Sequence, residues 1–191
     1  MRETKQKVFT RILATLFCAF CLAGCNDDES GFSASQVRQA LFDLKGTYHG
    51  NVQVAYYHGS NITELTDAVA VSKDSLTFTM SLLPMANLIA EESVADVLRQ
   101  IGEINVTAEY DFQQMDGHTL NFVLHPEEVT ILGGYGAPPS VRIVFAQTFG
   151  GDAETDKNFI MFNISPQELW INGTKHEDFK QLVYHFRGTY E

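Results

Sequence analysis

The chain has 191 residues, with 24 acidic against 13 basic side chains and a formal net charge of −11. This acidic balance argues against nucleic-acid binding, because phosphate recognition needs clustered Lys and Arg. All three cysteines, Cys18, Cys21 and Cys25, lie near the N-terminus. The rest of the chain therefore has no disulfide, thiol nucleophile or cysteine-based zinc site.

Residues 1–24 have the pattern of a secretory signal peptide. A basic start is followed by an uncharged apolar run from Ile12 to Leu22. That run is shorter than the ~20 residues a helix needs to span a bilayer. A basic head, a short apolar middle and a small-residue end predict export followed by cleavage.

The sequence Leu22-Ala23-Gly24-Cys25 resembles the lipobox of bacterial lipoproteins. The resemblance implies cleavage between Gly24 and Cys25, a diacylglyceryl group on the Cys25 sulfur, and acylation, for instance by palmitate, of its new amino group. Two or more acyl chains hold a protein stably on a membrane. The alternative is an ordinary signal peptide with a coincidental cysteine.

An acidic segment, Asn26-Asp27-Asp28-Glu29, follows the cysteine. It resembles the export signal of surface lipoproteins in Bacteroidetes-type bacteria, which implies the outer membrane and an outward-facing head. The alternatives are the periplasmic face and a plain solvated tether over residues 25–33. Residues 25–191 keep 9 basic and 23 acidic side chains, a charge of −14. We expect a single domain over 34–191.

The first predicted element after the tether is a short helix. Val37, Ala40, Leu41 and Leu44 make one apolar stripe. Ser33 or Ser35 can cap this helix, and Gly46 can end it.

After Gly46 the apolar period changes to two, and about nine short strands are predicted. The clearest are 75–83 and 104–112, and the last is 181–190. A helical insertion at about 85–101 is predicted either kinked or divided, with Ser93 capping its second part. By composition, residues 133–139 and 150–158 are predicted to be loops.

Strands with one polar face favour an antiparallel sheet, and many of them joined by turns favour a β-barrel or a β-sandwich. The fold class is therefore mainly β with accessory helices. The stretches KGTYHG (45–50) and FRGTYE (186–191) are alike. This similarity predicts that the first and last strands lie side by side and close the sheet. A chance match is the alternative.

The lipobox, the acidic tether and the opening LKGTYHGNVQV (44–54) resemble small Bacteroidetes-type lipoproteins of a domain family of unknown function. Several such families are similar to lipocalin-like barrels, which implies an apolar ligand. The lipocalin Gly-x-Trp signature is absent here, where Gly46-Thr47-Tyr48 stands instead.

Six aromatic residues are candidates for lining a cavity that binds an apolar or glycan ligand: Tyr48, Tyr56, Tyr110, Phe145, Phe162 and Trp170. The alternative is a packed aromatic core, because inward side chains fill small barrels. Asp74-Ser75-Leu76 resembles the O-glycosylation sequence of the same bacteria and makes Ser75 a candidate acceptor. A turn explains these residues equally well.

No catalytic residue, cofactor or metal is predicted. The sequence has no nucleophile elbow, phosphate loop, dinucleotide fingerprint or His-Glu-x-x-His. Asp152, Glu154 and Asp156 have calcium-loop spacing, but Lys157 and Asn163 occupy the positions of the required glycine and glutamate. Adjacent carboxylates at 91–92 and 127–128 do not converge by themselves.

The leading functional hypothesis is therefore a lipid-anchored envelope protein that binds a small apolar or glycan ligand or serves as an accessory subunit. The second is an adhesion or inhibitor-like protein that acts through a protein partner. A hydrolase is the third.

Overall fold

A computed structural model describes residues 31–57, 59–134, 139–176 and 181–190. The chain divides into two units, Met1–Gly31 and Phe32–Glu191, and every element below belongs to the second. The signal peptide, Cys25 and residues 25–30 of the predicted tether lie outside the described residues. Within the described ranges, no helix is long and apolar enough to cross a membrane.

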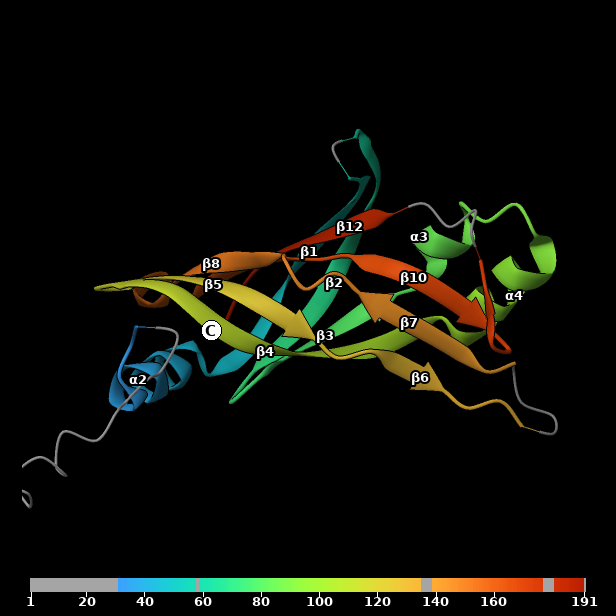
Figure 1. Cartoon of the computed structure of the whole chain (residues 1–191). Coiled ribbons are helices and arrows are strands. Elements are labelled where there is room, and N and C mark those ends of the chain that lie inside the picture. Colours follow the sequence, from blue (N-terminus) through green and yellow to red (C-terminus); the bar gives the residue numbers. More distant parts are fainter. Residues whose placement is uncertain (1–30, 58, 135–138, 177–180, 191) are drawn as a thin grey trace, which may run out of the picture. The chain divides into compact units, whose positions relative to one another are not determined.

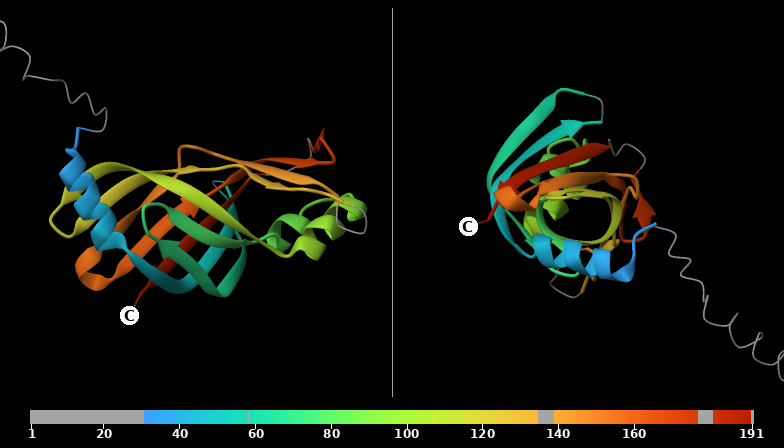
Figure 2. Two further views of the ribbon diagram at one scale, coloured as in Figure 1. Left: turned by 90° about the horizontal axis from the view of Figure 1, so that it is seen from below. Right: turned by 90° about the vertical axis from the view of Figure 1, so that its left-hand side faces the viewer.

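Eight antiparallel strands form a closed barrel, so the predicted mainly β fold is confirmed (Figures 1 and 2). The order around the ring is β1-β12-β9-β8-β5-β4-β3-β2, and β2 pairs back with β1. The barrel strands are β1 (Gly46–Tyr56), β2 (Asn61–Ser72), β3 (Leu76–Ser81), β4 (Glu103–Asp116), β5 (Thr119–Pro126), β8 (Gly150–Glu154), β9 (Phe159–Ile164) and β12 (Leu182–Thr189).

The first and last strands close the ring, as the repeated Gly-Thr-Tyr sequence predicts. β1 pairs with β12 from His49 to Tyr56, and Gly50 lies opposite Gly188. A Cβ on Gly50 would stand 1.9 Å from the carbonyl oxygen of Arg187. Glycine at this position therefore permits the close approach of the two strands. The Tyr48 and Tyr190 rings meet edge to face, with centroids 5.0 Å apart.

A second, smaller sheet is built from segments next to three barrel strands in the chain: β6 (Val129–Ile131) follows β5, β7 (Val141–Phe145) precedes β8, and β10 (Pro166–Ile171) follows β9. With β11 (Thr174–Lys175), these strands lie in the order β11-β10-β7-β6. The buried Ser165 separates β9 from β10. Its hydroxyl donates to the carbonyl of Leu182 at 2.7 Å, and its own carbonyl accepts from the backbone N–H of Ala146 at 2.9 Å. These bonds satisfy the polar groups that the break between β9 and β10 exposes.

The predicted loop at 150–158 is wrong in its first half. Gly150–Glu154 is barrel strand β8, followed by the short 3-10 helix η1 (Thr155–Lys157). A Cβ on Gly151 would stand 1.9 Å from the carbonyl oxygen of Met161 on β9. Close packing of neighbouring strands explains these glycines, whereas composition alone treats paired glycines as a turn.

Helix α2 (Ala34–Leu44) begins as predicted and ends earlier. Ser33 is the N-cap in a reciprocal capping box with Gln36. Lys45 is the extended C-cap, so Gly46 already belongs to β1. Leu44 is fully buried, and its carbonyl accepts from the Tyr48 hydroxyl at 2.8 Å. The end of the helix is thereby bonded to the first barrel strand.

The helical insertion is divided into α3 (Leu83–Ala86) and α4 (Glu92–Ile101), at the opposite end of the barrel from α2 (Figure 2). The prediction that Ser93 caps the second helix is wrong. Glu91 is the N-cap, and the Ser93 hydroxyl donates to its carboxylate at 2.7 Å. Acidic residues near a helix N-terminus interact favourably with the helix dipole, so the helix can start at this position without a serine cap.

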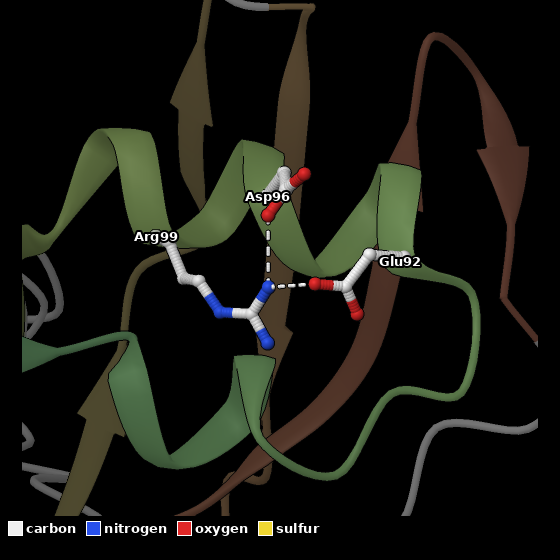
Figure 3. A network of polar contacts seen from close by, with 3 residues as sticks. All are labelled: Glu92, Asp96 and Arg99. Atoms are coloured by element: carbon white, nitrogen blue, oxygen red, sulfur yellow. Dashed lines mark hydrogen bonds and ion pairs between the residues drawn. The ribbon is translucent and has the colours of Figure 1, made fainter.

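Helix α4 is amphipathic, with Val94, Ala95, Val97 and Leu98 buried. On its polar face the Arg99 guanidinium contacts Glu92 at 2.6 Å and Asp96 at 2.8 Å (Figure 3). Exposed pairs of this kind contribute little free energy each, so burial of the apolar face is the main force holding α4 in place.

Candidate functional site: a slot in the barrel wall

The six aromatic candidates do not converge on one cavity. Tyr48, Phe145 and Phe162 are at most 1% exposed. Phe162 stacks on Phe186 at 4.9 Å and meets Phe78 edge to face at 5.5 Å. These contacts are typical of a packed aromatic core, which the sequence analysis gave as the alternative to a ligand cavity.

Tyr110, Tyr56 and Trp170 have other surroundings. Tyr110 donates its hydroxyl to Ser72 at 2.8 Å and lies against Phe122, and burial raises its pKa. Tyr56 is a half-buried residue at the end of β1. Trp170 is half-buried on β10, between the buried Leu169 and Ile171, and alternation places it on the opposite face of the second sheet.

A slot opens in the barrel wall where β2 and β3 separate. These strands pair only through Ala70, Val71 and Ser72 of β2, opposite Phe78, Thr77 and Leu76. The preceding part of β2 follows β1 instead. The β1–β2 hairpin accordingly projects away from the ring (Figure 2).

A bulge in β2 accompanies this separation. Gly50 faces Ala68 whereas Val52 faces Leu65, so two residues of β2, Thr66 and Asp67, stand opposite one of β1. Asp67 has a left-handed φ of 59°. A bulge bends its strand and increases the local twist, which turns the start of β2 away from β3.

The slot has a volume of about 460 Å³, which is within the usual range for small-ligand sites. Val52 and Phe78, both 1% exposed, and the half-buried Leu65 form an apolar floor. Three carboxylates from two strands, Glu64, Asp67 and Glu103, lie at the rim together with the hydroxyls of Thr66, Thr79 and Ser81. No Lys or Arg is among the lining residues.

The rim carboxylates have no ion-pair partner within the described ranges. Asp67 accepts a hydrogen bond from the neighbouring Thr66 hydroxyl at 3.2 Å. The slot therefore presents negative charge and hydrogen-bond acceptors around an apolar base. It is suited to a ligand with an apolar part and neutral or cationic polar groups.

Sequence reasoning missed these residues, although one signal was present. Residues 62–72 alternate poorly, because the apolar Leu65 and Ala68 are three positions apart rather than two. A break in a period of two is the signature of a bulge. Glu64 on β2 and Glu103 on β4 line one pocket only because β2 pairs with β3 and β3 pairs with β4.

A second polar surface surrounds Trp170 on the outer face of the second sheet. Cross-strand pairing aligns Thr130, Arg142, Trp170 and Lys175 in one row. The Arg142 guanidinium lies 4.4 Å from the indole centroid. Glu168 accepts from the indole N–H at 2.9 Å and from Lys175 at 2.6 Å, and the Lys175 hydrogen bond, more than that of the indole, lowers its pKa. A pocket of about 330 Å³ adjoins this row and is partly lined by Leu132, which is 82% exposed.

A third feature is a polar row on the outer barrel wall. Asn163, His185, Gln53 and Glu64 are successive cross-strand neighbours on β9, β12, β1 and β2. His185 Nδ1 lies 2.7 Å from Asn163 Oδ1. Burial, followed by the nearby Arg187 charge, lowers the pKa of His185 and so favours the neutral imidazole. Among the described residues, no group of three His, Cys, Asp or Glu side chains is arranged to hold a metal ion.

Ser75, the candidate glycosylation acceptor, lies half-buried in the turn between β2 and β3. Its carbonyl accepts from the backbone N–H of Lys73 at 3.0 Å. The turn that the sequence analysis gave as the alternative explanation is therefore present, and modification of Ser75 stays a prediction.

Comparison with known proteins leaves the family open. No protein-family model matches the chain, and no curated protein matches it. Among solved structures, it is similar to a Bacteroides fragilis protein provisionally described as an outer membrane protein, with a TM-score of 0.39 and 16% identity. The match covers 78% of this chain and 52% of that protein, so the chain spans about half the length of its neighbour. A similarity this distant establishes neither a shared fold nor a shared activity.

Proposed function

We propose that this chain is a lipid-anchored protein of the bacterial outer membrane, exposed at the cell surface, whose β domain binds an amphipathic ligand in the β2–β3 slot. The lipobox at Leu22–Cys25 and the acidic segment after it support the anchor and the location. The slot of about 460 Å³, with an apolar floor and an acceptor-rich rim, supports ligand binding. This slot is the single observation on which the binding role rests.

The lining of the slot narrows the ligand class. The apolar part of the ligand packs on Val52, Leu65 and Phe78. Hydroxyl or ammonium groups donate to the rim carboxylates of Glu64, Asp67 and Glu103. A free fatty acid is disfavoured, because its carboxylate would meet three like charges. Apolar molecules with hydroxyl or amine groups, and glycans with an apolar face, belong to the favoured class.

The binding role is tested by filling the slot. In Ala68→Trp a large ring occupies the pocket, while Ala55→Trp places the same ring on β1 outside it. Full-length protein is purified from native membranes, and the molecules that copurify are identified by native mass spectrometry. We expect a molecule that is retained by the wild-type protein and Ala55→Trp and lost from Ala68→Trp. Equal retention by both variants, or no bound molecule in the wild-type protein, would contradict the proposal.

The anchor is tested separately with Cys25→Ser, which removes the acceptor thiol. We expect the variant to incorporate no palmitate and to keep its signal peptide. Normal processing and membrane retention of this variant would refute the lipoprotein assignment. Digestion of the head by protease added to intact cells distinguishes the cell surface from the periplasmic face.

The second candidate function, binding of a protein partner through the outer surface, is favoured by one observation. Leu132 is 82% exposed and lines one pocket with the half-buried Trp170, and tryptophan is enriched among the residues that anchor protein interfaces. Leu132→Ser and Trp170→Ala are expected to abolish crosslinking of a partner on intact cells while leaving the molecule bound in the slot unchanged. Unchanged crosslinking by both variants would exclude this surface.

A further inference from the structure

The open edge of β2 is the basis of a further inference about the ligand. From Thr63 to Val69, apart from the bulge residues Thr66 and Asp67, β2 is paired with β1 on one side. On its other side, no strand pairing and no other backbone hydrogen bond involves these residues within the described ranges. Alternate residues of an edge strand direct N–H and C=O groups outward. Those groups face the β2–β3 slot.

The opposite side of the slot is also a strand edge. Thr79, Met80 and Ser81 of β3 pair with Asn105, Ile104 and Glu103 of β4 and with no residue of β2. Tyr184 already donates its hydroxyl to the Ser81 carbonyl at 2.9 Å. The free hydrogen-bonding edge is therefore longer on β2 than on β3.

The separation is part of the fold rather than fraying at a strand end. It begins next to the bulge at Thr66–Asp67, and beyond the bulge Val52, Gln53 and Val54 pair with Leu65, Glu64 and Thr63. The start of β2 is thus held in place by β1. An ordered strand edge beside an apolar pocket is the arrangement that proteins use to bind extended peptides by strand addition.

We infer that the ligand of the β2–β3 slot is an extended peptide with a basic side chain, which adds as a strand along the free edge of β2 and completes the barrel wall. The inference rests on the proposed function and specifies its ligand. The basic side chain follows from charge complementarity with Glu64, Asp67 and Glu103, because no cation lines the slot. The peptide pairs with β2 because β2 has the longer free edge. It runs antiparallel to β2 because antiparallel pairing is more stable per residue than parallel pairing.

The test measures backbone hydrogen exchange by mass spectrometry on the detergent-solubilised full-length protein. The probe is a pool of capped peptides of about six residues, the usual length of a strand. Its members alternate valine and threonine and have one lysine at a varied position. One control pool is N-methylated at alternate amides, which removes pairing donors and keeps the side chains. A second control pool replaces lysine with glutamate.

We expect the lysine pool to slow exchange several-fold in residues 63–69, the glutamate pool to act more weakly and the N-methylated pool to have no effect. A triple variant, Glu64→Gln with Asp67→Asn and Glu103→Gln, should remove the difference between the lysine and glutamate pools. Absence of protection by the lysine pool, or equal protection by the N-methylated pool, would overturn strand addition. A non-peptide molecule retained by the wild-type protein and lost from Ala68→Trp would overturn it too, while leaving the proposed function intact.

Discussion

Replacing Gly50 with alanine tests the account of barrel closure. The new methyl group would stand 1.9 Å from the carbonyl oxygen of Arg187 and 2.6 Å from the Cα of Gly188. Both are backbone atoms, so a side-chain rotation cannot relieve the contact, and β1 must move away from β12. Overpacking of this kind costs about 3 kcal/mol. The loss of chain entropy in the unfolded state returns about 0.4–1 kcal/mol.

The expected net loss is about 2 kcal/mol, which lowers the melting temperature of a domain of this size by roughly 4–8 °C. The assay is urea and thermal unfolding of the full-length protein, followed by circular dichroism. Asn51→Ala, at the exposed neighbouring position on β1, is the matched control and should stay within about 0.5 kcal/mol of the wild-type value. Equal stability of Gly50→Ala and Asn51→Ala would refute the close strand contact at the closure.

Three further predictions concern the core, the buried tyrosines and the first helix. Phe162→Ala should lower the free energy of unfolding by about 3–5 kcal/mol in urea titrations, because a fully buried ring is removed. Phe42→Ala, at a 72% exposed position, should have little effect. Similar urea midpoints for the two variants would contradict the packed interior. Burial raises the pKa of Tyr184 above its unfolded value. The folded state therefore keeps a proton that the unfolded state loses, and unfolding free energies should fall as pH rises above about 10. Tyr184→Phe should make that decline shallower, and an unchanged slope would count against the buried phenol. Ser33→Ala should cost about 1 kcal/mol through loss of the helix cap, and Ser35→Ala should cost less in the same titration; a larger effect at Ser35 would reassign the cap.

Much of the fold could be predicted from local sequence. Alternation in 104–112 placed Ile104, Val106 and Ala108 inside, and all three are buried. The Asp-Gly sequence typical of hairpins lies at the β4–β5 connection, where Asp116 pairs with Thr119 and the loop residues are Gly117, at a φ of 58°, and His118. These features depend on residues close together in the chain, where period and turn chemistry decide the conformation. The repeated Gly-Thr-Tyr sequence also predicted that the first and last strands close the sheet. The start of β1 does lie beside the end of β12.

The glycines and the helix start show where local reasoning failed. Gly150-Gly151 belongs to a strand, because the backbone of β9 comes within contact distance of where a side chain would stand. The distance between the backbones of β8 and β9 is set by tertiary packing, which local sequence does not specify. The same holds for α4, whose first residue follows Glu91 rather than Ser93. Propensity allows either start, and the packing of the apolar face of the helix selects one of them.

The sequence by itself predicted an export signal, an anchoring cysteine and a mainly β fold of barrel or sandwich type, because each of these predictions depends on short motifs or on the period of apolar residues. Only the tertiary structure decided which surface is available to a ligand. It buried Phe162 and Tyr48 in the core, left Trp170 on an outer face, and brought Glu64, Asp67 and Glu103 around one pocket. The physical reason is that strand pairing across the barrel sets the distances between these groups. A single bulge at Thr66–Asp67 then decides where the wall opens.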